Sequence, residues 1–279
     1  MAAQSKAITR LRKRSPTRRF HAYCIGTSKS GTHSIAEIFG GYYRVAYEPE
    51  YEQLIEMIIG ASSDALSQTQ MAEFVRSRDQ QLKLELECSH PLFYLLDTLL
   101  DEFPEARFIL TLRDCYSWLD SQINSQLSYI EAKCWQDFGE FKYGHENFHY
   151  PREEQILEQF GLYTLSGYLS AWASHNKKVL ERVPRDRLLV VRTGDIKKEM
   201  ITIAKFLGAK SNHVLHSGAH AFKGAKKFNL LMKLDPHYLE KKVNEYCRDL
   251  MDEFFPDVDV WTWQSREGSH TELITSMHL

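Results

Sequence analysis

The chain has 279 residues, of which 43% are hydrophobic and 26% are charged, and its formal net charge is −2. This length can bury a sizeable core, and the composition is typical of a folded globular protein and argues against a disordered one. No apolar run approaches the roughly 18 to 20 residues of a membrane span, and the N-terminus lacks the apolar core of a secretory signal, so we expect a cytoplasmic protein without a membrane span.

The basic residues gather at the N-terminus. Residues 1–19 hold seven of the 35 basic residues and no acidic one, which leaves 28 basic against 37 acidic residues in the rest of the chain. We interpret residues 1–19 as a flexible basic arm, 20–265 as a single domain and 266–279 as a flexible tail. The arm either only aids solubility or contacts nucleic acid, a membrane or an anionic acceptor, and the sequence leaves these alternatives open.

Along the predicted domain, short apolar runs alternate with helical patterns. Strands are expected over 22–26, 43–47, 82–87, 107–113 and 187–192, and helices over 31–40, 50–60, 64–80, 91–102, 115–130, 153–182, 195–207 and 236–254. Strands that alternate with helical crossovers predict an α/β fold with a mostly parallel central sheet flanked by helices. Ligands of such sheets bind beyond the carboxyl ends of the strands.

The first strand leads into a turn of small residues. Residues 26–34 read G-T-S-K-S-G-T-H-S and come directly before a helical pattern. Backbone N–H groups of such a turn and the positive end of the helix bind phosphate. The two glycines have the spacing of the nucleotide-binding loop G-x-x-x-x-G-K-[ST], but the lysine lies inside the loop, at Lys29, and Thr32 and His33 occupy the last two positions. The turn therefore indicates a phosphate-bearing donor that is held without a metal.

A second junction of strand and helix follows the apolar run 107–112. Arg113 closes this run, and Ser121 comes eight residues later, about two turns into the next helix. A guanidinium suits a terminal phosphate, and a serine hydroxyl adds a hydrogen-bond donor. The pair is therefore predicted to share one anion. The five cysteines form no C-x-x-C pair, which argues against a zinc site or a disulfide framework.

Together these segments resemble the sulfotransferases that use 3′-phosphoadenosine 5′-phosphosulfate (PAPS). In that family a K-[SG]-G-T loop holds the phosphosulfate and an R-x₇-S element holds the 3′-phosphate, which match residues 29–32 and Arg113 with Ser121. A third match is the strand and turn over 188–196, with a helix ending after it. The resemblance spans roughly residues 20 to 210 in the correct order. It implies a P-loop-like architecture with PAPS as donor, PAP as product and no metal.

The chain departs from the family at four places. His33 replaces the usual Thr or Arg, and Cys115 replaces a proline that often follows Arg-Asp. Thr193 and Gly194 replace Tyr-Glu, so an adenine-contacting tyrosine is missing there. Residues 222–226 match the family's Arg-Lys-Gly phosphate loop only faintly.

The resemblance also implies roles for single residues. Lys29 would stabilise the charge on the departing bridging oxygen. His33 has an alternative role as a simple N-terminal helix residue. Arg113 and Ser121 would bind the 3′-phosphate. The 5′-phosphate would be bound by Lys29 and the five residues after it, which are Ser30, Gly31, Thr32, His33 and Ser34.

The general base is open among four residues. Several branches of the family place a glutamate just after the second strand, and Glu48 has that position here. A partly desolvated carboxylate there is suited to take a proton, although Glu48 also fits an acid in a first helical turn beside a proline. The alternatives are Glu50, Glu87 and His90.

The sequence thus predicts a sulfotransferase that moves the sulfuryl group of PAPS in line to a hydroxyl or amine, with Glu48 as base and Lys29 on the leaving phosphate. We expect a small-molecule or glycan acceptor and no nucleic acid beyond the nucleotide donor, while the acceptor class and oligomeric state stay open. The alternatives are a non-catalytic PAP- or nucleotide-binding protein of the same fold, and a P-loop kinase. The displaced lysine argues against the kinase.

Overall fold

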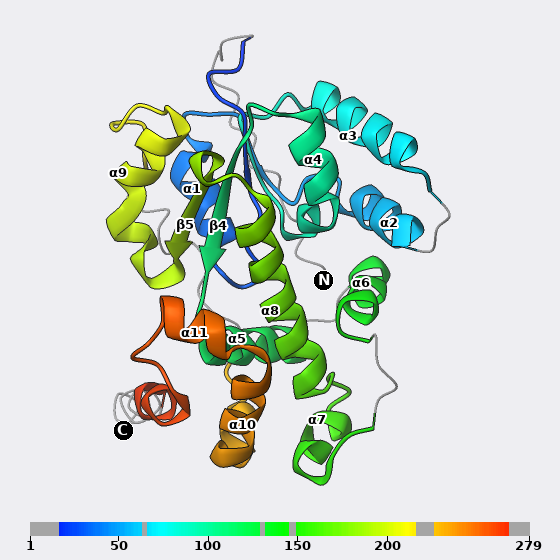
Figure 1. Ribbon diagram of the computed structural model, residues 1–279, viewed down its shortest axis with the longest axis vertical. Coiled ribbons are helices and arrows are strands. Elements are labelled where there is room, and N and C mark those ends of the chain that lie inside the picture. The colour runs from blue at the N-terminus through cyan, green and yellow to red at the C-terminus, as the bar shows by residue number, and fades with distance from the viewer. Residues whose placement is uncertain (1–16, 63–65, 129–131, 145–148, 216–225, 268–279) are drawn as a thin grey trace. The chain divides into compact units, whose positions relative to one another are not determined.

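The computed structural model describes residues 17–62, 66–128, 132–144, 149–215 and 226–267 (Figure 1). The chain divides into two compact units. The first unit comprises Met1–Leu112 and His175–Lys223, and the second comprises Arg113–Ser174 and Gly224–Leu279. The single domain over 20–265 stays a prediction, and most of the predicted arm and tail lies outside the described residues.

The first unit contains a parallel sheet of five strands in the order β2-β3-β1-β4-β5. Their bounds are β1 Ala22–Cys24, β2 Val45–Tyr47, β3 Leu86–Cys88, β4 Arg107–Leu112 and β5 Leu188–Arg192. In the register, Cys24 of β1 lies opposite Cys88 of β3 on one side and Ile109 of β4 on the other. The predicted α/β class is confirmed. Each predicted strand overlaps an observed one, but the strand predicted over 82–87 is misplaced, because Leu82 still belongs to α3 and β3 begins at Leu86.

Helices cover both faces of this sheet. In Figure 1, α1 and α9 lie on one side of β4 and β5, and α3 and α4 lie on the other. The bounds in the first unit are α1 Thr32–Gly40, α2 Tyr51–Ser62, α3 Gln68–Leu82, α4 Leu96–Glu102 and α9 Ile196–Leu207, with short 3₁₀ helices over His90–Leu95, Arg185–Arg187 and Thr193–Asp195; α8, Leu165–Arg182, ends in this unit. Because both faces are buried, the strands read as apolar runs.

Local signals fix several helix ends. Ser67 and Gln70 form a capping box at the start of α3, in which the Ser67 hydroxyl accepts from Gln70 N at 3.3 Å and Ser67 N donates to the Gln70 side chain at 2.8 Å. The helix α9 ends before Gly208, its C-cap, whose φ of 74° is a left-handed conformation that favours glycine. The predicted helix over 91–102 begins instead as a 3₁₀ helix with Pro91 in its first turn.

The second unit is helical in its described part. The bounds are α5 Cys115–Ser128, α6 Lys133–Tyr143, α7 Gln155–Gln159, α10 Pro236–Tyr246 and α11 Arg248–Phe254, with a 3₁₀ turn over Arg152–Glu154 and the start of α8. Two predictions are wrong in detail: the helix over 153–182 is broken between α7 and α8, and the helix over 236–254 is interrupted at Cys247.

The break before α8 has a tertiary cause. The buried carboxylate of Glu154 accepts from Leu165 N at 2.8 Å and from the Tyr238 hydroxyl at 2.7 Å. It therefore supplies a partner to the first turn of α8, while Gly161 takes a positive φ of 64° in the connection.

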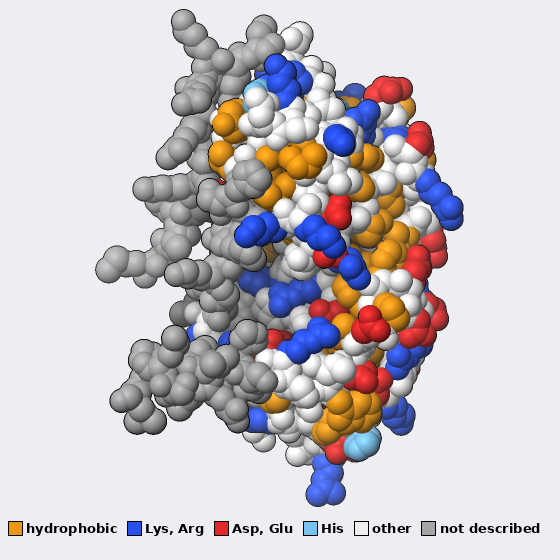
Figure 2. Space-filling model, turned by 90° about the vertical axis from the view of Figure 1, so that its left-hand side faces the viewer, with side chains coloured by type: hydrophobic (Ala, Val, Ile, Leu, Met, Phe, Trp, Pro, Cys, Tyr) orange, Lys and Arg blue, Asp and Glu red, His pale blue; other side chains and the backbone are white. Residues whose placement is uncertain are grey.

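Charged side chains of both signs are interspersed on the face that Figure 2 shows, as the small net charge of −2 leads one to expect. Within the described ranges, no helix is long and apolar enough to span a membrane.

Candidate active site at the carboxyl ends of the central strands

The loop between β1 and α1 is fixed by close packing at two glycines. A Cβ on Gly26 would lie 2.0 Å from Thr111 Oγ1 and 2.5 Å from the Thr111 carbonyl oxygen, so only glycine fits there. Gly31 has a φ of 106°, and a Cβ on it would lie 2.5 Å from Ile196 Cδ1. The glycine spacing seen in the sequence is therefore required by the structure.

Ser30 closes this loop from inside. Its buried hydroxyl donates to Thr27 O at 2.6 Å and lies 2.7 Å from the Thr111 hydroxyl, and its backbone N–H also donates to Thr27 O at 3.2 Å. Both donors of Ser30 are thus used within the loop. Donation from its hydroxyl to a phosphate would require the loop to open.

The loop contains Lys29 and leads directly into α1. Lys29 has a φ of 64°, a strained conformation for a residue other than glycine, as is common at ligand-binding loops. Gly31 is the N-cap of α1 and provides no side-chain cap to its first turn. Thr32 is buried, whereas His33 and Ser34 are half-buried. The N–H groups in the first turn of a helix are in general suited to bind an anion.

Tyr47 connects the start of α1 with Glu48. Tyr47 directly precedes Glu48 in the chain, and its ring meets the His33 ring edge-on at 4.9 Å. Burial, together with the nearby Glu48 carboxylate, holds the pKa of Tyr47 well above its usual value.

Glu48 and His90 form a direct pair. His90 Nδ1 lies 2.7 Å from Glu48 Oε1, and the two side chains are 8% and 15% exposed. Glu48 N donates to Cys88 O at 3.0 Å, which joins the segments of the two residues, and Ser89 N donates to Cys24 O at 3.1 Å, which ties the His90 segment to β1. A carboxylate that contacts Nδ1 orients the imidazole ring. Two of the four residues predicted as candidates for the general base, Glu48 and His90, are thus in direct contact.

The other two candidates are engaged by a buried arginine. Arg78 binds Glu87 through two bonds of 2.6 and 2.8 Å. Glu50 accepts from Gln81 Nε2 at 2.7 Å and lies 3.9 Å from Arg78 Nε. A carboxylate paired with a guanidinium is a poor proton acceptor, so the geometry favours Glu48 and His90. Arg78 was missed in the sequence because a helical arginine reads as a surface charge.

Thr193 replaces the family's tyrosine, and its role is structural here. Its hydroxyl bonds to the carbonyl oxygen of Ser30 and lies 3.2 Å from that of Leu112, so it ties the loop to the end of β4. Of residues 222–226, only Lys226 lies among the described residues. No group of three or more His, Cys, Asp or Glu side chains that could hold a metal occurs in the described part of the chain.

Arg113 and Ser121 belong to the second unit. Arg113 precedes α5, whose start is capped by Asp114 through a bond of 2.9 Å from Ser117 N. Burial lowers the pKa of Arg113, against the opposite influence of Asp114 and Asp120. Ser121 is half-buried on α5. Their shared role at a 3′-phosphate stays a prediction.

Residues 23–214 match the model of the sulfotransferase domain. The chain belongs to the sulfotransferase domain family. The predicted family is thus confirmed.

A relative in Aspergillus versicolor, "Ava biosynthesis cluster protein M", is 31% identical over 106 residues, which are 36% of this chain and 41% of that protein. The match therefore spans less than half the length of this relative.

Similar solved structures include a sulfotransferase from Alicyclobacillus acidocaldarius, with 13% identity and a TM-score of 0.44 over 82% of this chain and 92% of that one. The sulfotransferase domain of the Synechococcus PCC 7002 olefin synthase is 13% identical, with a TM-score of 0.38 over 83% and 89%. Scores this low support no conclusion about fold or activity.

Proposed function

We propose that this member of the sulfotransferase family uses PAPS and transfers the sulfuryl group to a hydroxyl or amine, with the Glu48–His90 pair taking up the acceptor proton. One observation carries the proposal. The pair lies next to the first turn of α1, because Tyr47, which directly precedes Glu48, meets the His33 ring of that turn at 4.9 Å. A proton acceptor beside an anion-binding turn is the arrangement that group transfer from a phosphate-bearing donor requires.

The loop fits the phosphosulfate end of the donor, which would supply the sulfuryl group when bound. Gly26 and Gly31 let the loop pack against Thr111 and Ile196, where any Cβ would clash, and α1 begins without a side-chain cap. The backbone N–H groups of Gly31, Thr32, His33 and Ser34 bind the 5′-phosphate in this proposal. Ser30 shapes the loop from inside, and the Lys29 ammonium stabilises negative charge on the leaving oxygen.

Glu48 and His90 handle the proton together. His90 Nδ1 faces the Glu48 carboxylate at 2.7 Å, a contact that orients the carboxylate and the ring at once. A coupled pair takes up a proton as a unit, and variants of each partner report its share. General base catalysis of this kind contributes about 10²- to 10⁴-fold to a rate.

Arg113 and Ser121 are retained as ligands of the 3′-phosphate on the strength of the sequence motif. A small-molecule or glycan acceptor is retained on the same ground, because a carboxylate-linked base suits a hydroxyl proton.

Calorimetric titration with PAP in the absence of metal, with ADP as the control, tests the donor. We expect PAP to bind at least tenfold more tightly than ADP, and equal affinities would overturn the assignment. Glu48→Gln and His90→Asn should then each lower the rate of PAPS turnover by about 10²-fold or more. Glu56→Gln, at an exposed position of α2 that has no part in the site, is the matched control and should retain the wild-type rate. PAP affinity should change less than about twofold in all three.

Wild-type turnover in Glu48→Gln and His90→Asn would remove the pair from the mechanism. Tight PAP binding without turnover of PAPS over sugar, phenol, alcohol and amine acceptors would favour the non-catalytic alternative. Mg²⁺-dependent ATP binding would favour the kinase.

A further inference from the structure

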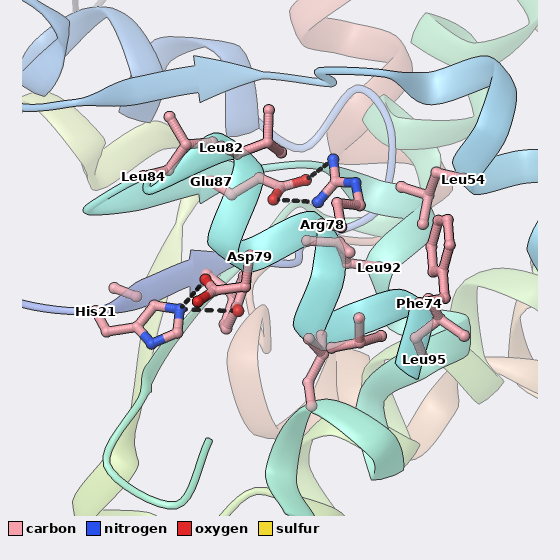
Figure 3. A pocket seen from close by; sticks show the side chains of 14 residues that line it. His21, Leu54, Phe74, Arg78, Asp79, Leu82, Leu84, Glu87, Leu92 and Leu95 are labelled. Atoms are coloured by element: carbon pink, nitrogen blue, oxygen red, sulfur yellow. Dashed lines mark hydrogen bonds and ion pairs between the residues drawn. The ribbon is translucent and has the colours of Figure 1, made fainter. Parts of the chain in front are cut away.

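A buried ion pair lies next to the turn that carries Glu48. Arg78 on α3 and Glu87 on β3 have side chains only 8% and 5% exposed, and Figure 3 shows the two groups facing each other between leucine side chains. The fork of Arg78 meets both carboxylate oxygens of Glu87, at 2.6 and 2.8 Å. A buried ion pair contributes little net stability, because desolvation offsets the attraction.

Arg78 makes a third contact, to the turn itself. Its Nη2 donates to the carbonyl oxygen of Pro49 at 2.7 Å. Glu87 is three residues before His90 in the chain, and Pro49 is the residue after Glu48. One guanidinium therefore joins the segment that leads to His90 with the segment that follows Glu48.

The turn needs such a restraint because it is strained. Glu48 and Glu50 have φ angles of 46° and 50°, both in the left-handed region that side chains disfavour. Strained residues of this kind persist only where the surroundings over-determine them. Here the restraints are the bond from Glu48 N to Cys88 O at 3.0 Å, the Arg78 bond to Pro49 O and the Gln81 bond to the Glu50 carboxylate.

We propose that Arg78, paired with Glu87, is a positioning residue that holds the strained 48–50 turn so that Glu48 meets His90. The proposal rests on the proposed function, because it assigns Arg78 an effect on the pair that takes up the proton. Arg78 acts through the Pro49 carbonyl and does not touch the reacting atoms.

The space beside the ion pair is too small for a substrate. The cavity that Figure 3 shows has a volume of about 20 Å³, and six of its fourteen lining residues are leucines. This is room for about one water molecule. The Arg78–Glu87 pair is therefore not itself an acceptor site.

The test removes the ion pair without leaving a buried charge. Removing only Arg78 would leave Glu87 uncompensated and destabilise the fold, whereas replacing both by apolar residues of similar size is often tolerated. In the double variant Arg78→Met/Glu87→Met we expect kcat to fall about 10- to 100-fold, since a misplacement of about 1 Å costs a rate of this order. PAP affinity should stay within about twofold, because the loop at Lys29 is not altered.

Two further readouts separate positioning from general damage. The pH–rate profile and the NMR titration of the His90 imidazole, identified through His90→Asn, should both shift in the double variant. The matched control is Arg76→Met/Glu102→Met, which removes a 2.7 Å ion pair between α3 and α4 and should leave the rate and both titrations unchanged. Arg78→Lys keeps the charge but lacks the fork, so it should show a smaller loss and serves if the double variant does not fold.

Wild-type turnover of PAPS is measured first, and its absence is the failure of the proposed function. Once wild-type turnover is established, the double variant is compared with it, or Arg78→Lys if the double variant does not fold. If the variant keeps the wild-type kcat, pH profile and His90 titration, the positioning role is overturned and the proposed function still stands.

Discussion

Gly26→Ala tests whether the shape of the donor loop depends on the approach of β1 to β4. The added Cβ would lie 2.5 Å from the Thr111 carbonyl oxygen, where an ordinary contact begins near 3.4 Å, so one chain must move by about 0.9 Å. Thr111 has little freedom to yield, because it lies within β4 and pairs with Val191 of β5. The loop must therefore shift, and the Ser30–Thr111 contact of 2.7 Å must stretch.

Overpacking of this kind costs about 1–3 kcal/mol, and each 1 kcal/mol lowers the melting temperature by about 2–4 °C in a chain of this size. A shift of nearly 1 Å also takes backbone donors out of hydrogen-bond range, so PAP should bind about tenfold more weakly or worse. Differential scanning calorimetry and PAP titration measure the two effects.

The matched control is Gly40→Ala on α1. A Cβ there meets no atom within 4 Å, and alanine favours a helix by about 0.5–1 kcal/mol over glycine. Its melting temperature should be unchanged or slightly higher, and its PAP affinity unchanged. A Gly26→Ala protein with wild-type melting temperature and PAP affinity would refute the reasoning from close packing.

Three other predictions follow from single side chains. Lys29→Ala should lower sulfuryl transfer about 10²-fold or more at an unchanged melting temperature, and undiminished turnover would remove Lys29 from the mechanism. Arg113→Ala should weaken PAP binding several-fold in calorimetry, and unchanged affinity would place the 3′-phosphate elsewhere. The pKa of Glu85 is lowered, since donors from Arg19 and Arg44 outweigh the effect of burial. Its contribution to stability is therefore complete above the unfolded pKa, about 4.3, and lost as the pH falls through the lower folded pKa. Urea unfolding of Glu85→Gln should show a larger deficit against wild type at pH 7 than at pH 3, and equal deficits would contradict this assignment.

The strands and the donor loop could be predicted because their signals are local. Each strand is an apolar run, and the loop carries its glycines at the spacing that the contact of Gly26 with Thr111 demands. The sulfotransferase family could be predicted from the order of these motifs along the chain. The prediction of one continuous helix over 153–182 was wrong, because the break in it depends on Glu154 and Tyr238, which are far apart in sequence.

The choice of the base lay beyond the sequence for a similar reason. Glu48, Glu50 and Glu87 are equivalent as isolated carboxylates near strand ends. They differ only once Arg78, at a position that reads as solvent-facing, turns inward to Glu87 and His90 meets Glu48. Such differences arise from tertiary contacts that no periodicity encodes.

The strand order has a consequence for synthesis on the ribosome. The central strand β1 emerges first, yet Ala22 pairs with Leu86 and Arg107, 64 and 85 residues later. At about 5–20 residues per second, both edges of this apolar strand wait about 3–13 s for β3 and about 4–17 s for β4. The nascent chain thus exposes β1, the central strand of the later sheet, before either neighbouring strand has been synthesised. A chaperone that recognises apolar segments would have most effect on the yield of folded protein during this interval.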